Sequence, residues 1–202
     1  MQEIQICDKT LRCSHTAAET LALDGEKVLR VVKTDKQDIF DEDTYVLIPE
    51  VLLSDGTVEV KVRSRLLPDA PDFARGFIGI VFRVNGPEFE SFYVRPTNGR
   101  HPDPVRRSHG CQYFSYPGYT FAYFREHGIE GYEAPADIGL DEWITVRAVI
   151  KDDTARFFVN DAEVLVVPKL KHGKSAGGIG FYVDTGTEGF FKDLMIEPSS
   201  DQ

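Results

Sequence analysis

Arginine, histidine, glutamine and aromatic side chains gather in one region of this sequence. The stretch "VRRSHGCQYFSYPGYTF" (105–121) holds two adjacent arginines, a histidine, a glutamine and five aromatic residues, but no Asp or Glu. The chain as a whole has 33 Asp and Glu residues against 23 Lys and Arg residues, so this stretch is a local exception. With its upstream neighbours it supplies the candidate ligand-binding residues, which are Arg83, Tyr93, Arg95, Asn98, Arg107, His109, Gln112, Tyr113, Tyr116 and Tyr119.

These residue types suit the binding of a sugar. Aromatic rings stack on the C–H faces of a sugar ring, and planar polar groups bind its hydroxyls. Arginine favours an acidic sugar, because its fork of donors meets both oxygens of a carboxylate. The structural alternative is that the arginines pair with carboxylates of this acidic chain and that the tyrosines only pack a long loop.

His109 and Tyr113 are the candidates for acid–base catalysis. An unperturbed imidazole has a pKa of about 6.5 and therefore exchanges protons at neutral pH. A lone histidine without an identifiable carboxylate partner is more often structural. Cys111 lies two residues from His109, which suggests a thiolate and its base, but we favour a small buried cysteine.

Period-2 alternation runs through most of the chain, as expected of strands. In "TVEVKVRSR" (57–65) three valines point to one face and the charged residues point to the other, which is typical of a sheet that covers a core. "FIGIVFRV" (77–84) is apolar on both faces until Arg83, as expected of a central strand. Further strands are predicted at 27–33, 44–49, 89–95, 142–150, 155–160, 164–168, 177–184 and 188–198.

Short strands separated by turn residues predict an all-β fold, an antiparallel two-sheet β-sandwich or jelly roll. No linker or shift in composition divides the chain, so residues 1–202 are predicted to form a single domain. Residues 17–23 offer too few turns for a helix. Residues 96–120 are predicted to be a long loop that enters a strand near Gln112, and loops of this length are usually functional when they are ordered.

Composition limits the classes of partner and the compartment. A net charge of -10 argues against nucleic acid and against an anionic membrane surface. No segment approaches the roughly 20 apolar residues of a membrane span. The first residues, "MQEIQICDKTLRC", lack the apolar run of a signal peptide, so we expect a cytoplasmic protein. An odd number of cysteines, Cys7, Cys13 and Cys111, fits reduced thiols better than disulfides.

Several motifs together resemble a known superfamily. "GFIGIVFRV", "SFYVRPTNGR" and the C-terminal strands that contain "FFVND" and "FFKDLMI" are similar to those of concanavalin A-like lectin/glucanase sandwiches. More narrowly, residues 57–197 resemble the laminin-G-like bacterial proteins grouped with the 3-keto-disaccharide hydrolase domain. The resemblance implies sugar binding on the concave face of a sheet, but the superfamily holds lectins, hydrolases and lyases, so it does not specify an activity.

Two catalytic signatures of related sandwiches are not met. The Glu-x-Asp-x-x-Glu strand of laminarinase-type hydrolases places its outer glutamates on one face. The nearest acidic cluster, "DIFDED" (38–43), has another spacing. The Gln-x-His strand of alginate-lyase-type sandwiches is also absent, because Gln112 is followed by Tyr113 and Phe114. Asp193 matches a position where related sandwiches hold calcium, a cation that would need several further oxygens.

Three hypotheses follow from the sequence. The first is a carbohydrate-binding β-sandwich that recognises an acidic or keto-sugar on one sheet face. The second is a glycoside hydrolase or lyase that acts on small oligosaccharides at the same face. The third is a non-catalytic structural or interaction module. No cofactor is required by any of them, and calcium at Asp193 is an additional expectation.

Overall fold

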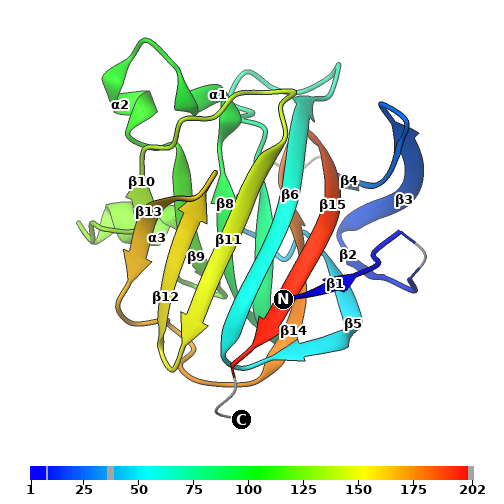
Figure 1. Cartoon of the computed structure of the whole chain (residues 1–202). Coiled ribbons are helices and arrows are strands. Elements are labelled where there is room, and N and C mark those ends of the chain that lie inside the picture. Colours follow the sequence, from blue (N-terminus) through cyan, green and yellow to red (C-terminus); the bar gives the residue numbers. More distant parts are fainter. Residues whose placement is uncertain (8, 36–38, 200–202) are drawn as a thin grey trace.

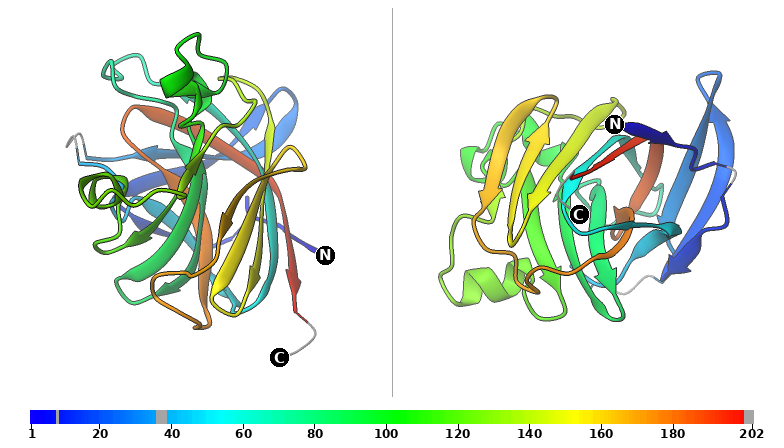
Figure 2. Two further views of the ribbon diagram at one scale, coloured as in Figure 1. Left: turned by 90° about the vertical axis from the view of Figure 1, so that its left-hand side faces the viewer. Right: turned by 60° about the horizontal axis from the view of Figure 1, so that its bottom comes forward.

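The alternating segments form two antiparallel sheets in the computed structural model, which describes residues 1–7, 9–35 and 39–199. β6 (Gly56–Leu66) shows the pattern most clearly, because every second residue from Gly56 to Ser64 is buried. The sheets lie face to face, and their paired apolar faces enclose the core (Figures 1 and 2). The described chain is therefore an all-β sandwich, as the sequence predicts.

One sheet has eight strands and contains β6 at its centre. Seven strands follow the order β13-β12-β11-β6-β15-β4-β3, and β1 pairs with β15 beside them. Their bounds are β1 Gln2–Ile4, β3 Thr16–Leu23, β4 Glu26–Lys33, β6 Gly56–Leu66, β11 Ile144–Lys151, β12 Thr154–Val159, β13 Ala162–Val167 and β15 Thr187–Pro198.

The other sheet has seven strands in the order β10-β9-β8-β7-β14-β5-β2. Their bounds are β2 Arg12–Ser14, β5 Tyr45–Leu53, β7 Ile78–Asn85, β8 Glu88–Val94, β9 Cys111–Tyr116, β10 Glu133–Ala134 and β14 Gly177–Val183. β7 lies in the middle of this sheet, in agreement with the apolar character of both its faces. Its neighbour β8 pairs with β9 so that Tyr93 lies opposite Gln112.

The seven-stranded sheet is buried on both faces. Its inner face contributes Phe82, Phe92 and other side chains to the core between the sheets. Its outer face carries a second cluster of buried side chains, which are Phe77, Val81, Phe89, Tyr93, Phe114 and Tyr182. Strands buried on both faces lose the simple alternation of apolar and polar residues, and the second cluster requires segments that cover it from outside.

Three short helices lie in the connections between strands of this sheet. α1 (Pro96–Gly99) and α2 (Pro104–Arg107) lie between β8 and β9, and α3 (Phe121–Glu126) lies between β9 and β10. A proline occupies the first turn of α1 and of α2. A backbone N–H at this position would have no acceptor within the helix, so a proline, which lacks the N–H, fits there. Thr120 caps α3 by accepting a hydrogen bond from the Tyr123 amide. Figure 2, left, shows α3 on the outer side of the seven-stranded sheet, away from the eight-stranded one.

The predicted strands are confirmed, with boundary differences of a few residues. The sequence patterns missed the short strands β1, β2 and β10, and left residues 17–23 unassigned, where β3 forms. The long loop predicted at 96–120 contains the short helices α1 and α2, and the strand predicted near Gln112 is confirmed as β9. Among the described residues, no helix combines the length and the apolar composition needed to span a membrane.

Candidate functional site

The candidate site lies on the outer face of the seven-stranded sheet, where β8 ends. Side chains alternate along a strand, so Phe92 and Val94 face the core while Tyr93 faces outward. Gln112 lies on β9 directly opposite Tyr93. Arg95 follows β8 on the Tyr93 side, and its amide donates to the Gly110 carbonyl at 2.7 Å. Two neighbouring strands thus bring three predicted residues together.

Arg95 is the centre of a buried hydrogen-bond network, with only 7% of its side chain exposed. One guanidinium nitrogen donates to the Tyr93 hydroxyl at 2.9 Å and to Oε1 of Gln112. The other donates to Glu133 at 2.5 Å. The guanidinium also lies 5.2 Å from the centroid of the Tyr93 ring. These contacts hold a full positive charge in one fixed orientation inside the protein.

Asp41 extends the network from a connection far away in the sequence. It is fully buried, and its carboxylate accepts hydrogen bonds from the Tyr93 hydroxyl at 3.0 Å and from the Phe121 amide at 2.7 Å. Burial raises the pKa of Asp41 to about 7, although these hydrogen bonds and Arg95 act in the opposite direction. A carboxyl group with such a pKa changes its protonation state near neutral pH.

Glu133 connects Arg95 to two further side chains. Its carboxylate accepts from Arg125 at 2.9 Å, and it lies 3.8 Å from Nε2 of His109. Burial favours the neutral carboxyl group, but Arg95 and Arg125 outweigh it and keep the pKa of Glu133 below its ordinary value. Burial lowers the pKa of His109, so its imidazole is mainly neutral at pH 7. A carboxylate that the sequence did not reveal therefore lies near His109, beyond hydrogen-bond distance.

An open cleft of about 290 Å³ lies beside this network, and we call it the arginine cleft. Aromatic rings form much of its wall. The Phe40 ring lies 5.2 Å from the Phe73 ring and 5.9 Å from the Phe121 ring, measured between centroids. The residues that line it are Phe40, Phe73, Arg75, Phe77, Tyr93, Arg95, Asn98, Arg106, His109, Phe121 and Arg125.

The arginine cleft is strongly cationic. It is lined by four arginines, and none of the described residues that line it carries a carboxylate. Within the described part of the chain, Arg75 donates only to backbone carbonyls, and burial together with the charges of Arg106 and Arg95 lowers its pKa. Arg106 donates to Oδ1 of Asn98, whose amide nitrogen in turn donates to the His109 carbonyl at 3.0 Å. Asn98 therefore orients Arg106.

A second cleft of about 690 Å³ adjoins the first, and we call it the glutamine cleft. His109 and Arg125 line both clefts. The remaining lining residues of the glutamine cleft are Ser108, Gln112, Phe124, Gly128, Ile129, Glu130, Gly131, Tyr132, Glu133 and Pro135. Most of them belong to α3 and to the connection that leads into β10.

Arg83 does not reach this site. A bulge interrupts the pairing of β7 between Phe82 and Asn85, and Arg83 has a φ of 52°. The added residue reverses the alternation, so Val84 instead of Arg83 packs on the outer aromatic cluster. The Arg83 guanidinium is buried elsewhere, where it donates to three backbone carbonyls and to Asp55. These carbonyls belong to Ser54, Asp152 and Gly173.

Tyr113 faces the wrong side of its strand for a catalytic role at this site. It alternates with Gln112 and Phe114, so its ring lies in the core between the sheets. Its hydroxyl donates to Glu90 at 2.6 Å and accepts from the Lys171 amide. Cys111 is buried on the same inner side, and burial raises the pKa of its thiol to about 12, which disfavours the thiolate.

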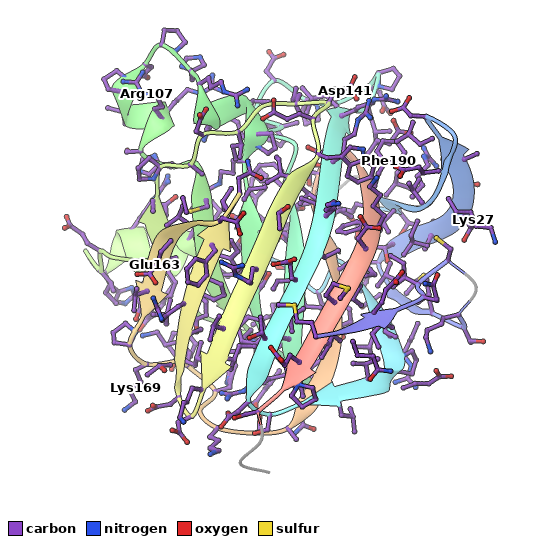
Figure 3. All side chains as sticks on the ribbon, in the orientation of Figure 1. Lys27, Arg107, Asp141, Glu163, Lys169 and Phe190 are labelled. Atoms are coloured by element: carbon purple, nitrogen blue, oxygen red, sulfur yellow. The ribbon has the colours of Figure 1, made fainter. Side chains whose placement is uncertain are left out.

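The other predicted residues lie outside the two clefts. Arg107 is exposed on α2 and donates to the His101 and Pro102 carbonyls (Figure 3). Tyr116 stacks on Phe89, and Tyr119 packs edge-on against Tyr123. Asp193 forms an ion pair with Lys61 at 2.8 Å. The described part of the chain contains no group of three or more His, Cys, Asp or Glu side chains that could hold a metal ion.

Sequence reasoning missed most of the site. Asp41 belongs to the acidic cluster whose spacing did not fit a hydrolase, Glu133 lies in the short strand β10 that the patterns missed, and only the fold brings both to Arg95. The missed residues that line the arginine cleft are Phe40, Phe73, Arg75, Phe77, Arg106, Phe121 and Arg125. One signal was available in "DFARGF" (72–77), where two aromatic residues flank an arginine directly before a strand.

Comparison with known proteins defines the fold more closely. No protein-family model matches this chain, and no curated protein matches its sequence. The carbohydrate-binding module CBM66 from Bacillus subtilis is similar in structure, with a TM-score of 0.56 and 14% identity over 92% of this chain and 96% of that chain. A Bacillus subtilis protein of unknown function with a galectin-like fold also has a TM-score of 0.56, with 12% identity over 93% and 88%. The chain shares the two-sheet β-sandwich fold of these structures.

A third similar structure is a protein from Parabacteroides distasonis described as a candidate glycosyl hydrolase. Its TM-score is 0.54, with 11% identity over 95% of this chain and all of that chain. At these identities the likeness concerns the fold alone. The shared fold agrees with the antiparallel two-sheet β-sandwich predicted from sequence. The narrower likeness to the 3-keto-disaccharide hydrolase group stays a prediction.

Proposed function

We propose that this protein binds an acidic sugar in the arginine cleft. The observation that carries the proposal is the pair Arg75 and Arg106, two arginines that line an aromatic cleft and form no ion pair with any described carboxylate. On a chain with a net charge of -10, unpaired arginines held close together require a reason. An anionic ligand supplies one, because its charge relieves their mutual repulsion.

The aromatic wall favours a sugar over a simple anion. The Phe40, Phe73 and Phe121 rings are half-buried and line the same cleft as the arginines. Such surfaces match the C–H faces of a sugar ring, while the guanidinium groups bind a carboxylate and neighbouring hydroxyls. The names of two similar structures, a carbohydrate-binding module and a candidate glycosyl hydrolase, point to the same class of ligand.

A second candidate function is cleavage of a saccharide at the same face. It is favoured by His109, which is about one third exposed, lines both clefts and has a lowered pKa, so that a neutral base faces the ligand. Incubation with an oligosaccharide panel tests this candidate. New reducing ends, or the absorbance of an unsaturated product, would support cleavage, whereas binding without any product would exclude it.

The experiment for the first candidate compares acidic sugars with their neutral parents. Isothermal titration calorimetry at low salt would use galacturonate against galactose and glucuronate against glucose, with and without calcium chloride. Keto-gluconates belong in the same panel, because the narrower sequence likeness is to a keto-disaccharide group. We expect a uronate or keto-acid to bind and its neutral parent to bind at least ten times more weakly, a difference of about 1.4 kcal/mol.

Arg106 and Arg107 provide a matched pair of variants. Arg106 lines the arginine cleft, whereas its neighbour Arg107 points away from it and contacts backbone carbonyls. Arg106→Gln should weaken uronate binding by about tenfold, the size expected for one charged hydrogen bond. Arg107→Gln should leave it unchanged. Equal affinities of the two variants would refute the proposed site.

A further inference from the structure

The side-chain amide of Gln112 has a defined orientation. Arg95 can only donate hydrogen bonds, so the Gln112 atom that faces it must be the oxygen Oε1. The same oxygen lies 3.2 Å from the Tyr93 hydroxyl. Nε2 is therefore directed away from the Arg95 network. It is buried and has no hydrogen-bond partner among the described residues, which is costly for a polar group.

Gln112 belongs to the lining of the glutamine cleft, whereas its partner Arg95 lines the arginine cleft. A ligand oxygen in the glutamine cleft would satisfy the amide nitrogen. Ile129 and Tyr132 line the same cleft and provide apolar surface for a sugar ring. Because His109 and Arg125 line both clefts, the two spaces adjoin, and one molecule can occupy them together.

The charges of the two clefts differ. Glu130 and Glu133 line the glutamine cleft, and Arg125 is already bound by Glu133. An acidic sugar residue in this cleft would lie beside these carboxylates. Arg125 could not balance its charge, because Arg125 is already paired with Glu133. A cationic group could pair with these carboxylates, but it could not accept the hydrogen bond that Nε2 of Gln112 donates. The glutamine cleft therefore suits an uncharged residue with oxygen acceptors.

We propose that the ligand is a disaccharide or longer saccharide with a defined order of residues. Its acidic residue occupies the arginine cleft, and an adjoining uncharged residue occupies the glutamine cleft and accepts a hydrogen bond from Nε2 of Gln112. His109 and Arg125 lie at the junction of the two residues. This inference rests on the proposed binding of an acidic sugar and adds the length, order and charge of the ligand.

The test compares a uronate monosaccharide with disaccharides that link glucuronate or galacturonate to a neutral hexose through different bonds. We expect at least one disaccharide to bind at least ten times more tightly than its uronate alone. In Ile129→Trp, a bulky ring at an exposed position of the glutamine cleft should remove this gain and leave the affinity for the monosaccharide unchanged. Val166→Trp, at an exposed position on the other sheet, is the matched control and should retain the gain.

Gln112→Glu tests the amide directly, because it keeps an oxygen against Arg95 and removes the donor. The ratio of disaccharide to monosaccharide affinity should fall to about one in this variant. The inference is overturned if the uronate binds but no disaccharide binds more tightly, or if Ile129→Trp and Val166→Trp show the same gain. If the uronate itself does not bind, the proposed function fails, and this inference fails with it.

Discussion

Asp41 allows a quantitative test of the buried network. Its carboxyl group is fully buried, and burial raises its pKa from 3.8 to about 7. Between these two values the folded state binds about one proton more than the unfolded state. The stability from this group is therefore fully present below about pH 4 and is lost as the pH rises through about 7.

The expected effect is large enough to measure. One bound proton changes the free energy of unfolding by about 1.4 kcal/mol per pH unit. Between the unfolded and the folded pKa values of Asp41, this free energy therefore changes by about 4 kcal/mol. Asp41→Asn replaces the titrating group with a neutral one of the same shape. An asparagine oxygen can still accept from the Phe121 amide, and its nitrogen can donate to the Tyr93 hydroxyl.

Urea unfolding at pH 4.5, 5.5, 6.5 and 7.5 provides the assay, with the single Trp143 as the fluorescent probe. We expect the Asp41→Asn protein to gain stability relative to wild type by about 1.4 kcal/mol for each pH unit between 4.5 and 6.5. Contributions from all other titrating groups cancel in this difference. A difference that stays constant over this pH range would refute the reasoning.

Three further predictions concern residues around the site. Arg83→Leu removes a buried guanidinium that binds three backbone carbonyls and Asp55, and it should lower the free energy of unfolding by about 3 kcal/mol or more, while uronate affinity stays unchanged; urea unfolding and calorimetry measure the two effects. Glu133→Gln removes the carboxylate partner of buried Arg95 and should cost about 3 kcal/mol at pH 7. Since the pKa of Glu133 is lowered in the folded state, this deficit should narrow as the pH falls below its ordinary value of 4.5, and a deficit independent of pH would contradict the ion pair. Cys111 should not react with a thiol reagent at pH 8 until the protein unfolds, whereas exposed Cys13 should react in the native state; rapid native labelling of Cys111 would contradict its burial.

The strands and part of the site could be predicted because they depend on local patterns. Alternation in the sequence of β8 places Tyr93 and Arg95 on one face, and that relation survives in the structure. Asn98, His109 and Gln112 also reach the two clefts. His109 and Gln112 lie in the stretch without acids, which was the signal that marked them, and Asn98 lies in the long connection before it.

The remaining features depend on contacts that no local pattern contains. A bulge moves Arg83 off the outer face, and a bulge of one residue leaves no clear mark in an apolar strand. Asp41 and Glu133 lie far from Arg95 in the sequence, so only the completed fold shows that they share its network. Arg106 and Arg107 are adjacent, and the orientation of one helical turn decides which of them lines the cleft.

Nuclear magnetic resonance of the arginine side chains tests the central claim most directly. Wild-type protein labelled with ¹⁵N would be titrated with galacturonate and, separately, with galactose. We predict that galacturonate shifts the Nε–H signals of Arg75 and Arg106, that Arg107 keeps its signal position, and that galactose leaves all three signals unchanged. Unchanged signals of Arg75 and Arg106 at concentrations where calorimetry detects galacturonate binding would contradict an acidic-sugar site in the arginine cleft.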